Sequence, residues 1–180
     1  MKKFIALLRG INVSGQKKIK MSELKSLFEE MGFQDVETYI QSGNVVFSSK
    51  KKSCEKLEAK ISSGIKSRFN FDVHIIVINP GDIEYILKNN PFLKKKKDIE
   101  KLYVTFLSKI PSDEYIVKLY LIDYLPEEYV IDGRYSYIFV PNGYGRAKLN
   151  NNFFENKLKV FGTTRNWKTV IALSELAKLQ

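Results

Sequence analysis

The hydrophobic pattern of the first half alternates between short apolar runs, which indicate buried strands, and stripes at helical spacing, which indicate helices. One stripe begins at Met21 and ends at Gly32, and Ser53 is placed to cap the helix of the second. Ser42-Gly43 is expected to form a two-residue hairpin loop. Strands are predicted over residues 4–8, 36–41, 44–49 and 73–78. The resulting order of strand, helix, strand, strand, helix, strand is the ferredoxin-like pattern.

The second half predicts a similar series, after a short helix that Pro91 ends. Asp132-Gly133 suits a type I′ turn and predicts a hairpin around it. Thr163 or Thr164 is expected to cap a last helix that carries Trp167 on its apolar face. The other elements are predicted as strands over 102–107, 129–131 and 135–140, and as helices from Pro111 and over 153–160.

This order predicts an α+β fold of two ferredoxin-like (RRM-like) subdomains, with antiparallel sheets packed into one compact unit. Asn79-Pro80-Gly81 interrupts the chain, so we place the subdomains at residues 1–80 and 81–180. As a charged loop, the lysine run 94–97 is the best local candidate for a subdomain boundary, and it is otherwise a solvated turn. The first strand is apolar on both faces and needs a second cover, which the other half could supply.

Composition narrows the class of protein. A hydrophobic fraction of 44% is that of a folded chain. Cys54 is the single cysteine, so an intrachain disulfide is excluded, which fits a reducing, cytoplasmic location. Residues 1–9 resemble the start of a signal peptide, but Arg9 ends the apolar run. No run reaches the roughly 20 apolar residues that span a bilayer, so no membrane partner is expected.

The formal net charge of +10 makes nucleic acid the first partner to consider. Only five of the basic residues are arginine and the rest are lysine. The planar guanidinium of arginine can bind a phosphate through two hydrogen bonds at once. A lysine-rich surface, in contrast, can result from an AT-rich genome without any binding role. Within the predicted loop 10–20, Lys17, Lys18 and Lys20 form a basic patch.

Catalytic chemistry is not indicated. His74, the single histidine, lies within an apolar run and is interpreted as a packed strand residue, although it is also the one candidate for a nucleophile's base. Cys54 stands at a helix start, where it is either a reactive thiol or a buried, inert one. Gly143-Tyr144-Gly145 lacks the third glycine of a dinucleotide loop. Glu127-Glu128 and Asp113-Glu114 are interpreted as exposed linker and helix-start residues, and neither pair is identifiable as an acid–base pair. With no cysteine and histidine cluster at zinc spacing and no Asp-x-Asp loop, we expect neither a metal nor a cofactor.

Two segments could hold an anion. A helix that opens over residues 163–167 would place free backbone N–H groups beside Arg165 and Asn166, unless it is an ordinary threonine cap with Trp167 in the core. The segment 143–148 is a basic, aromatic turn in which Lys148 could reach a phosphate, or it is only a turn.

Five motifs follow one another over essentially the whole chain. They are residues 8–13 (LRGINV), 20–21 (KM), 39–45 (YIQSGNV), 90–92 (NPF) and 163–167 (TTRNW). Together they resemble the bacterial DUF1697 family, a domain of unknown function. The resemblance implies two ferredoxin-like or RRM-like subdomains and brings no assigned activity. The family's turn reads Gly-x-x-Ser-Lys-Leu, whereas this chain has Gly143-Tyr144-Gly145-Arg146-Ala147-Lys148-Leu149 and lacks that serine.

The sequence therefore leads to competing hypotheses. The first is a binding module for a phosphate-bearing ligand, possibly nucleic acid, although the RNP1 pattern is absent and the strand at 44–49 has one aromatic residue, Phe47. The alternatives are an enzyme or effector-binding protein for a small anionic metabolite, with no reaction assigned, and a structural or protein-interaction domain.

For the binding hypotheses we expect Arg9 and Asn12 to form the site with Arg165, Asn166 and Lys148, and Gln41, Asn44 and Trp167 to be weaker members. Gln41 and Asn44 are weaker because parallel first and third strands would place their motif roughly 16 Å from Arg9.

Overall fold

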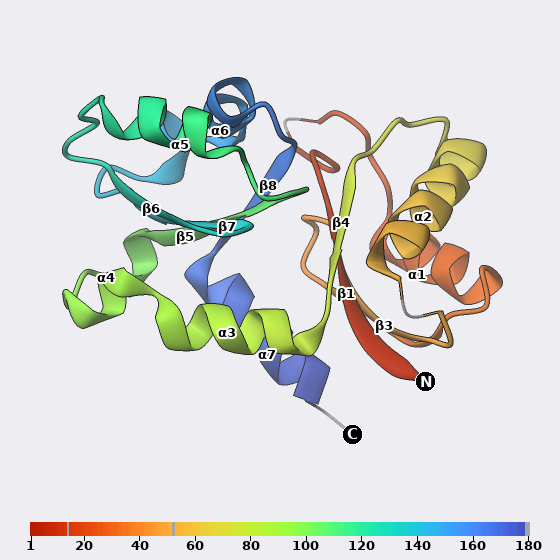
Figure 1. Cartoon of the computed structure of the whole chain (residues 1–180). Helices are drawn as coiled ribbons and strands as arrows, with labels where there is room; N and C mark the ends of the chain where they lie inside the picture. Colours follow the sequence, from red (N-terminus) through yellow and green to blue (C-terminus); the bar gives the residue numbers. More distant parts are fainter. Residues whose placement is uncertain (14, 52, 179–180) are drawn as a thin grey trace. The chain divides into compact units, whose positions relative to one another are not determined.

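The computed structural model describes residues 1–13, 15–51 and 53–178 (Figure 1). The chain divides into two units, and each contains a four-stranded antiparallel sheet with helices, so the fold class is α+β. The first unit comprises Met1–Glu84 and the C-terminal segment from Ala172, and the second unit comprises Tyr85–Ile171. The boundaries fall within helices α3 (Pro80–Asn89) and α7 (Trp167–Lys178). In the described part of the chain, no helix has both the length and the apolar character needed to cross a membrane.

The first unit follows the predicted series of elements. They are β1 (Lys2–Leu8), α1 (Met21–Glu30), β2 (Gln34–Tyr39), β3 (Asn44–Ser49), α2 (Cys54–Phe69) and β4 (Ile75–Ile78). The sheet order is β2-β3-β1-β4, and every pair of neighbours is antiparallel. Residues 4–8 of β1 are buried, as their unbroken apolar run predicted.

The expectation that the first and third strands are parallel is wrong. β1 and β3 are antiparallel, with Leu7 opposite Asn44 and Lys2 opposite Ser49. The reason is topological: β2 runs in the direction of β1, and the turn that follows reverses the chain before β3 inserts between them. The end of β1 therefore lies beside the beginning of β3.

The turn between β2 and β3 covers residues 40–43, so it is longer than the predicted two-residue loop. Ile40 and Gly43 both adopt left-handed backbone, with φ of 48° and 72°. A Cβ atom on Gly43 would lie 2.8 Å from Ile11 Cγ1 and from Leu8 Cβ. Only glycine fits there, because both the conformation and the close approach exclude a side chain.

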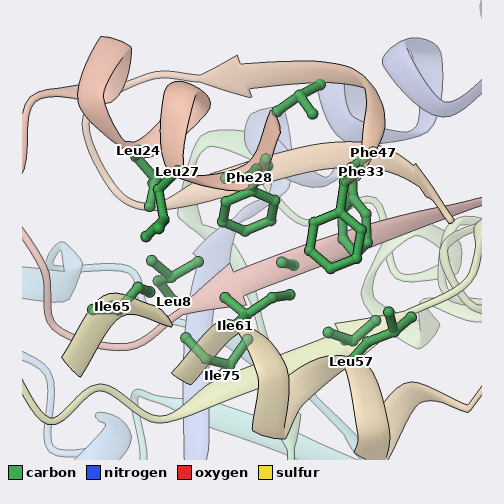
Figure 2. Packing of buried hydrophobic residues seen from close by; sticks show 14 of the residues in the cluster. Leu8, Leu24, Leu27, Phe28, Phe33, Phe47, Leu57, Ile61, Ile65 and Ile75 are labelled. Atoms are coloured by element: carbon green, nitrogen blue, oxygen red, sulfur yellow. The ribbon is translucent and has the colours of Figure 1, made fainter. Parts of the chain in front are cut away.

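Helices α1 and α2 pack on one face of the first sheet, as Figure 2 shows. Each helix contributes a buried stripe, Leu24, Leu27 and Phe28 from α1, and Leu57, Ile61 and Ile65 from α2. Phe47 of β3 lies between aromatic rings, with centroids 5.4 Å from Phe28 and 4.6 Å from Phe33. Ser53 caps α2 as predicted, since its hydroxyl accepts a hydrogen bond from the N–H of Lys56 at 3.3 Å.

The second unit repeats the series of elements. They are β5 (Leu102–Leu107), α5 (Asp113–Tyr120), β6 (Glu128–Asp132), β7 (Tyr135–Phe139), α6 (Asn151–Leu158) and β8 (Gly162–Asn166), preceded by α4 (Pro91–Lys94) and the 3-10 turn Ile99–Lys101, with a further 3-10 turn, Tyr144–Arg146, between β7 and α6. The sheet order is β6-β7-β5-β8, again antiparallel throughout. The two units therefore share one topology.

The last strand was not predicted. Residues 162–166 form β8 along the edge of β5, with Thr164 opposite Thr105 and their hydroxyl oxygens 2.7 Å apart. The helix expected to open at Thr163 or Thr164 instead begins at Trp167. Its cap is Asn166, whose side-chain oxygen accepts a hydrogen bond from the N–H of Thr169 at 2.8 Å. β-Branched threonines suit a strand better than a helix, which explains the outcome.

The predicted hairpin is present, but its turn differs. Asp132 pairs with Tyr135, so Gly133 and Arg134 form the loop. A type I′ turn needs positive φ at both loop residues, whereas only Gly133 has it here, at 58°. Glycine at the first loop position is instead the pattern of a type II′ turn.

Candidate functional site

The two motifs that the sequence analysis separated meet at one end of the first sheet. The N–H of Leu8 donates to the carbonyl of Gly43 at 2.8 Å, and the N–H of Arg9 donates to the carbonyl of His74 at 2.9 Å. The chain at the end of β1 is thus hydrogen-bonded on one side to Gly43, which precedes β3, and on the other to His74, which precedes β4. The expected separation of the two motifs is wrong, because it rested on parallel strands.

Asn12 joins these motifs through its side chain. Its amide nitrogen donates to the carbonyls of Ile19 and Gln41, both at 2.9 Å, and its oxygen accepts from the N–H of Ile19 at 2.8 Å. Its backbone is left-handed, with φ of 54°, a conformation that asparagine tolerates. Both donor hydrogens and one acceptor position are used, so Asn12 positions the loop 9–20 instead of presenting its amide to a ligand.

The two weaker members of the predicted site serve the turn. Gln41 contributes its backbone carbonyl to Asn12, while its side chain is exposed. Asn44 is buried, and its amide nitrogen donates to the carbonyl of Tyr39 at 3.1 Å and to the hydroxyl of Ser42 at 3.0 Å. Both residues therefore brace the turn that receives the end of β1.

The loop and the start of β4 enclose a hollow of about 320 Å³. We call it the β1 hollow, and its lining consists of Arg9, Gly10, Val13, Gln16, Lys17 and His74. None of these residues carries a carboxylate. Arg9 and Lys17 are half-buried and His74 is exposed. A guanidinium, an ammonium and an imidazole thus face a space the size of a small ligand site.

His74 lies outside the strand in which it was predicted to pack. β4 begins at Ile75, and the neighbours Val73 and Ile75 point into the core. Because side chains alternate across an extended chain, His74 points the other way and is exposed. The apolar run predicted a strand here but not its pairing with β1, and that pairing brings His74 beside Arg9.

Asp72, whose backbone contacts Lys17, turns its carboxylate toward Lys66. Lys17 donates to the backbone carbonyl of Asp72 at 2.6 Å, while the carboxylate of Asp72 pairs with Lys66 at 2.7 Å. The hydrogen bond from Lys66 lowers the pKa of the Asp72 carboxyl, burial opposes it as the next largest effect, and the charges of Lys66, Lys17 and His74 lower it further. Lys17 is therefore held by the carbonyl of Asp72, while the Asp72 carboxylate forms its ion pair with Lys66.

Arg165, the arginine expected at a helix end, lies in β8 of the second unit. Only 7% of its surface is exposed, and its guanidinium donates to the hydroxyl of Thr163 at 2.7 Å and to the carbonyl of Thr164 at 2.8 Å. Burial lowers its pKa to about 10, against the opposing charge of Tyr144. The helix end on which this prediction rested is not formed there, so a ligand contact by Arg165 stays a prediction.

The other predicted residues of the second unit have structural partners. Asn166 caps α7 and Trp167 is buried. Lys148 has an exposed side chain, and its N–H donates to Glu127 at 3.0 Å. Glu127, expected to be an exposed linker residue, also accepts the N–H of Leu149 at 2.9 Å and braces this turn.

The remaining candidates for chemistry were Cys54 and a metal-binding cluster. Cys54, interpreted as buried and inert or as reactive, is half-buried at the first position of α2. Among residues 1–13, 15–51 and 53–178, no group of three or more histidine, cysteine, aspartate or glutamate side chains could hold a metal ion. The lining of the β1 hollow contributes the basic side chains of Arg9, Lys17 and His74.

The structure is that of an α+β protein of two similar units, with a hollow lined by basic side chains at the end of its first strand. The model of DUF1697, described as a protein of unknown function, matches residues 1–137, and the chain belongs to this family. The motif at residues 163–167 lies beyond the matched part. No curated protein matches the chain.

A solved structure extends the comparison over nearly the whole chain. The conserved bacterial protein SP0830 from Streptococcus pneumoniae superposes with a TM-score of 0.78, covering 98% of each chain at 24% identity. This similarity establishes the shared fold.

Proposed function

We propose that the first unit binds a small phosphate-bearing ligand in the β1 hollow. The observation that carries the proposal is the convergence of Arg9, Lys17 and His74 on one space without a lining carboxylate. An arginine fork and a lysine ammonium are the side chains that recognise phosphate oxygens. The wider basic patch of Lys18 and Lys20 and the net charge of +10 would attract such a ligand.

We also assign each unit to the ferredoxin-like class. The support is the sheet orders β2-β3-β1-β4 and β6-β7-β5-β8, with a helix after the first and third strand of each unit. In RRM-type members of this class, single strands stack on exposed aromatic side chains of the central strands.

The sheet faces favour a small ligand over a single strand bound in this way. In the first unit, the face of β1 and β3 opposite the helices carries Ile5, Leu7 and Val46, which are buried and aliphatic. In the second unit, the aromatic rings of β7 are covered: Phe92 packs on Phe139 and Tyr85 on Tyr135, both at 6.3 Å between centroids.

Titration with inorganic phosphate and pyrophosphate at low salt tests the proposal. Arg9→Ala should weaken pyrophosphate binding about tenfold or more, because a hydrogen bond to a charged group is lost. Lys17→Ala should act in the same direction. Arg68→Ala and Lys25→Ala are matched controls, because both side chains are cations of the first unit outside the hollow.

Equal losses of pyrophosphate affinity in the Arg68 and Arg9 variants would show that binding depends only on the overall positive charge, and the proposed site would be wrong. Single-stranded oligonucleotides are titrated in parallel. If they bind far more tightly than pyrophosphate and with the same dependence on Arg9, the ligand is nucleic acid.

An enzyme acting on a small anionic metabolite is supported by one observation, the exposure of His74 in the hollow. An imidazole there could act as a proton donor or acceptor. If His74→Gln leaves the turnover of a bound phosphate ester unchanged, this role is excluded.

A further inference from the structure

The second unit exposes a group of large apolar side chains along α5 and the turn that follows it. The inner face of this helix is already used, because Leu119 is buried and Tyr115 and Ile116 pack against the same core, beside α6 (Figure 1). A helix at the surface normally carries polar residues on its outer side, so the packing of this unit does not account for the exposed ones. We call them the α5 patch, and they are Ile110, Val117, Tyr120, Leu121, Ile122 and Leu125.

The centre of the patch lies on one face of α5. Val117 is four residues before Leu121 and three before Tyr120, so these side chains are neighbours on the helix surface. Leu121, the C-terminal cap, keeps helical backbone with a φ of −74°. The ring of Tyr120 is held in place, since it stacks on Tyr129 at 5.3 Å between centroids and its hydroxyl accepts the N–H of Ile131 at 2.9 Å. The patch is therefore a preformed surface.

The exposed surface of the patch has the size of one side of a protein interface. Its six residues are 46–79% exposed, which corresponds to roughly 700 Å² if a fully exposed residue of these types has about 200 Å². Each partner contributes about 800 Å² to a stable interface of standard size. Monomeric proteins rarely leave an apolar patch larger than a few hundred Å² in water. The patch is thus large enough to form most of a dimer interface.

The charges around the patch complement those of a second copy. Four exposed charged residues lie symmetrically about residue 116 with opposite signs, Lys109 with Asp123 and Glu114 with Lys118. Asp113 is the one charge in residues 109–123 without such a counterpart. Two copies of this segment that run antiparallel across a two-fold axis near residue 116 therefore bring each of these cations near a carboxylate of the other copy.

The balance of charge along this segment also favours a second copy. Residues 109–123 contain two lysines and three carboxylates, whereas the whole chain has a net charge of +10. Two copies of so basic a chain repel one another in general, and this segment contributes nothing to that repulsion. The same balance disfavours an anionic membrane or a nucleic acid as the occupant.

We propose that the α5 patch is the interface of a two-fold symmetric homodimer, in which α5 packs antiparallel on α5 of a second copy. Val117 and Leu121 become buried at its centre, and Glu114 faces Lys118 of the second copy. In one copy these two side chains already form an ion pair at 2.5 Å, so dimerisation joins two such pairs into one network. The patch belongs to the second unit and shares no residue with the β1 hollow, so this inference is independent of the proposed function.

Sedimentation of the full chain without ligand, over a wide range of concentrations, tests the apolar part. The wild type should sediment as a dimer. Leu121→Lys should raise the dissociation constant of the dimer about tenfold or more, because it buries a charge at the centre of the interface. Ile99→Lys is the matched control, since Ile99 is an exposed aliphatic residue of the same unit outside the patch. Circular dichroism verifies that each variant is folded.

Charge exchange tests the antiparallel arrangement. In Glu114→Lys the introduced ammonium faces Lys118 of the second copy, and in Lys118→Glu the introduced carboxylate faces Glu114. Each variant alone should therefore dimerise several-fold more weakly at low salt. An equimolar mixture should form a heterodimer with about the wild-type affinity, because every facing pair then has opposite signs. Lys25→Glu and Glu29→Lys change an exposed pair of the same i,i+4 spacing on α1 and should not affect dimerisation.

Each outcome decides the proposal. Weaker dimerisation of the Leu121 variant together with recovery in the mixture supports it. A wild type that stays monomeric, a dimer that Leu121→Lys does not weaken, or a mixture that does not recover overturns it. Binding of a monomeric wild type to phosphatidylcholine vesicles, lost in Leu121→Lys, would assign the patch to a lipid surface and also overturn it. Pyrophosphate binding in the β1 hollow should be the same in all these variants.

Discussion

The two units differ clearly in the connection between their first strand and first helix. In the first unit it runs from Arg9 to Lys20 and is tied to the sheet by Asn12. In the second it is the short segment Ser108–Ser112, in which Pro111 is buried, leading directly into α5. One topology thus carries a long, basic loop in one copy and a minimal one in the other. The shared sheet and helices determine where in each unit a site can lie, and the loop between the first strand and first helix determines which side chains are placed there.

The two units also differ at the residue before their third strand, which is Gly43 in the first unit and Arg134 in the second. Gly43→Ala should destabilise the protein by about 3 kcal/mol, since it adds a clash with Leu8 and Ile11 to an unfavourable positive φ. Arg134→Ala should cost clearly less, because that position already accepts a side chain. Urea denaturation of both variants measures the difference, and similar midpoints would mean that the two turns are equally tolerant.

Asn12 has no equivalent in the short connection, so its loss should act on the first unit alone. Asn12→Ala should cost about 2 kcal/mol, because the Ile19 and Gln41 hydrogen bonds are lost at a φ of 54°. Asn12→Gly relieves the backbone conformation and should cost less. Amide exchange provides the local readout: the N–H of Ile19 should exchange faster in both variants, while those of β5 should not change. Faster exchange in β5 would contradict a local role.

Ser136 in β7 occupies the position that Val45 holds in β3. Its hydroxyl is fully buried and finds no hydrogen-bond partner among the described residues. Ser136→Ala should therefore raise the free energy of unfolding by about 1 kcal/mol. Thr105→Ala is the contrast, because it removes a hydroxyl that is paired with Thr164 and should destabilise. A loss of stability in Ser136→Ala would indicate a water or ligand partner for that hydroxyl.

Low pH should weaken the ion pairs of the two units to different extents, and the expected effect on stability is smaller than those above. The hydrogen bond from Lys97 lowers the pKa of Glu128, against the opposing effect of its burial. Because the folded pKa is lowered, this contribution is present above the ordinary pKa of 4.5 and is lost as pH falls through the lower folded value. Glu128→Gln should therefore remove about 0.5 kcal/mol near pH 7 and nothing at pH values below both pKa values.

Asp72 in the first unit has a lowered pKa for a similar reason, but its carboxylate is exposed and screened by solvent. Asp72→Asn should change stability less than Glu128→Gln, and added salt should remove what difference it makes. Urea midpoints at pH 3 and pH 7, with low and high salt, compare the two variants. A larger change in stability for Asp72→Asn than for Glu128→Gln would contradict this prediction.

Much of the fold could be predicted from the spacing of apolar residues, because a continuous apolar run indicates a buried strand and apolar residues at helical spacing indicate a helix. The strands β1 and β3 and the helices α1 and α2 follow from residues such as Phe4, Leu24 and Ile61. β8 could not be found in this way, since Gly162, Thr163 and Thr164 give no apolar alternation. Its identity depends on hydroxyl and backbone pairing with β5, which is a long-range property.

The candidate site was predictable only in part. Arg9 stood out because an arginine ended an apolar run beside glycine and asparagine. His74 did not, since its exposure depends on where β4 begins and which strand it pairs with. The meeting of Asn12 with Gln41 depends on the direction of β3, and the hydrophobic pattern does not encode strand direction.

The first unit is interrupted in sequence, because it resumes at Ala172 after the whole second unit. Lys3 and the carbonyl of Leu176 form a hydrogen bond at 3.5 Å between opposite ends of the chain. The whole first sheet, β1 to β4, nevertheless lies within residues 2–78, so it leaves the ribosome before the second unit. A stalled chain ending before Ala172 would therefore carry this sheet without the C-terminal segment that completes the first unit.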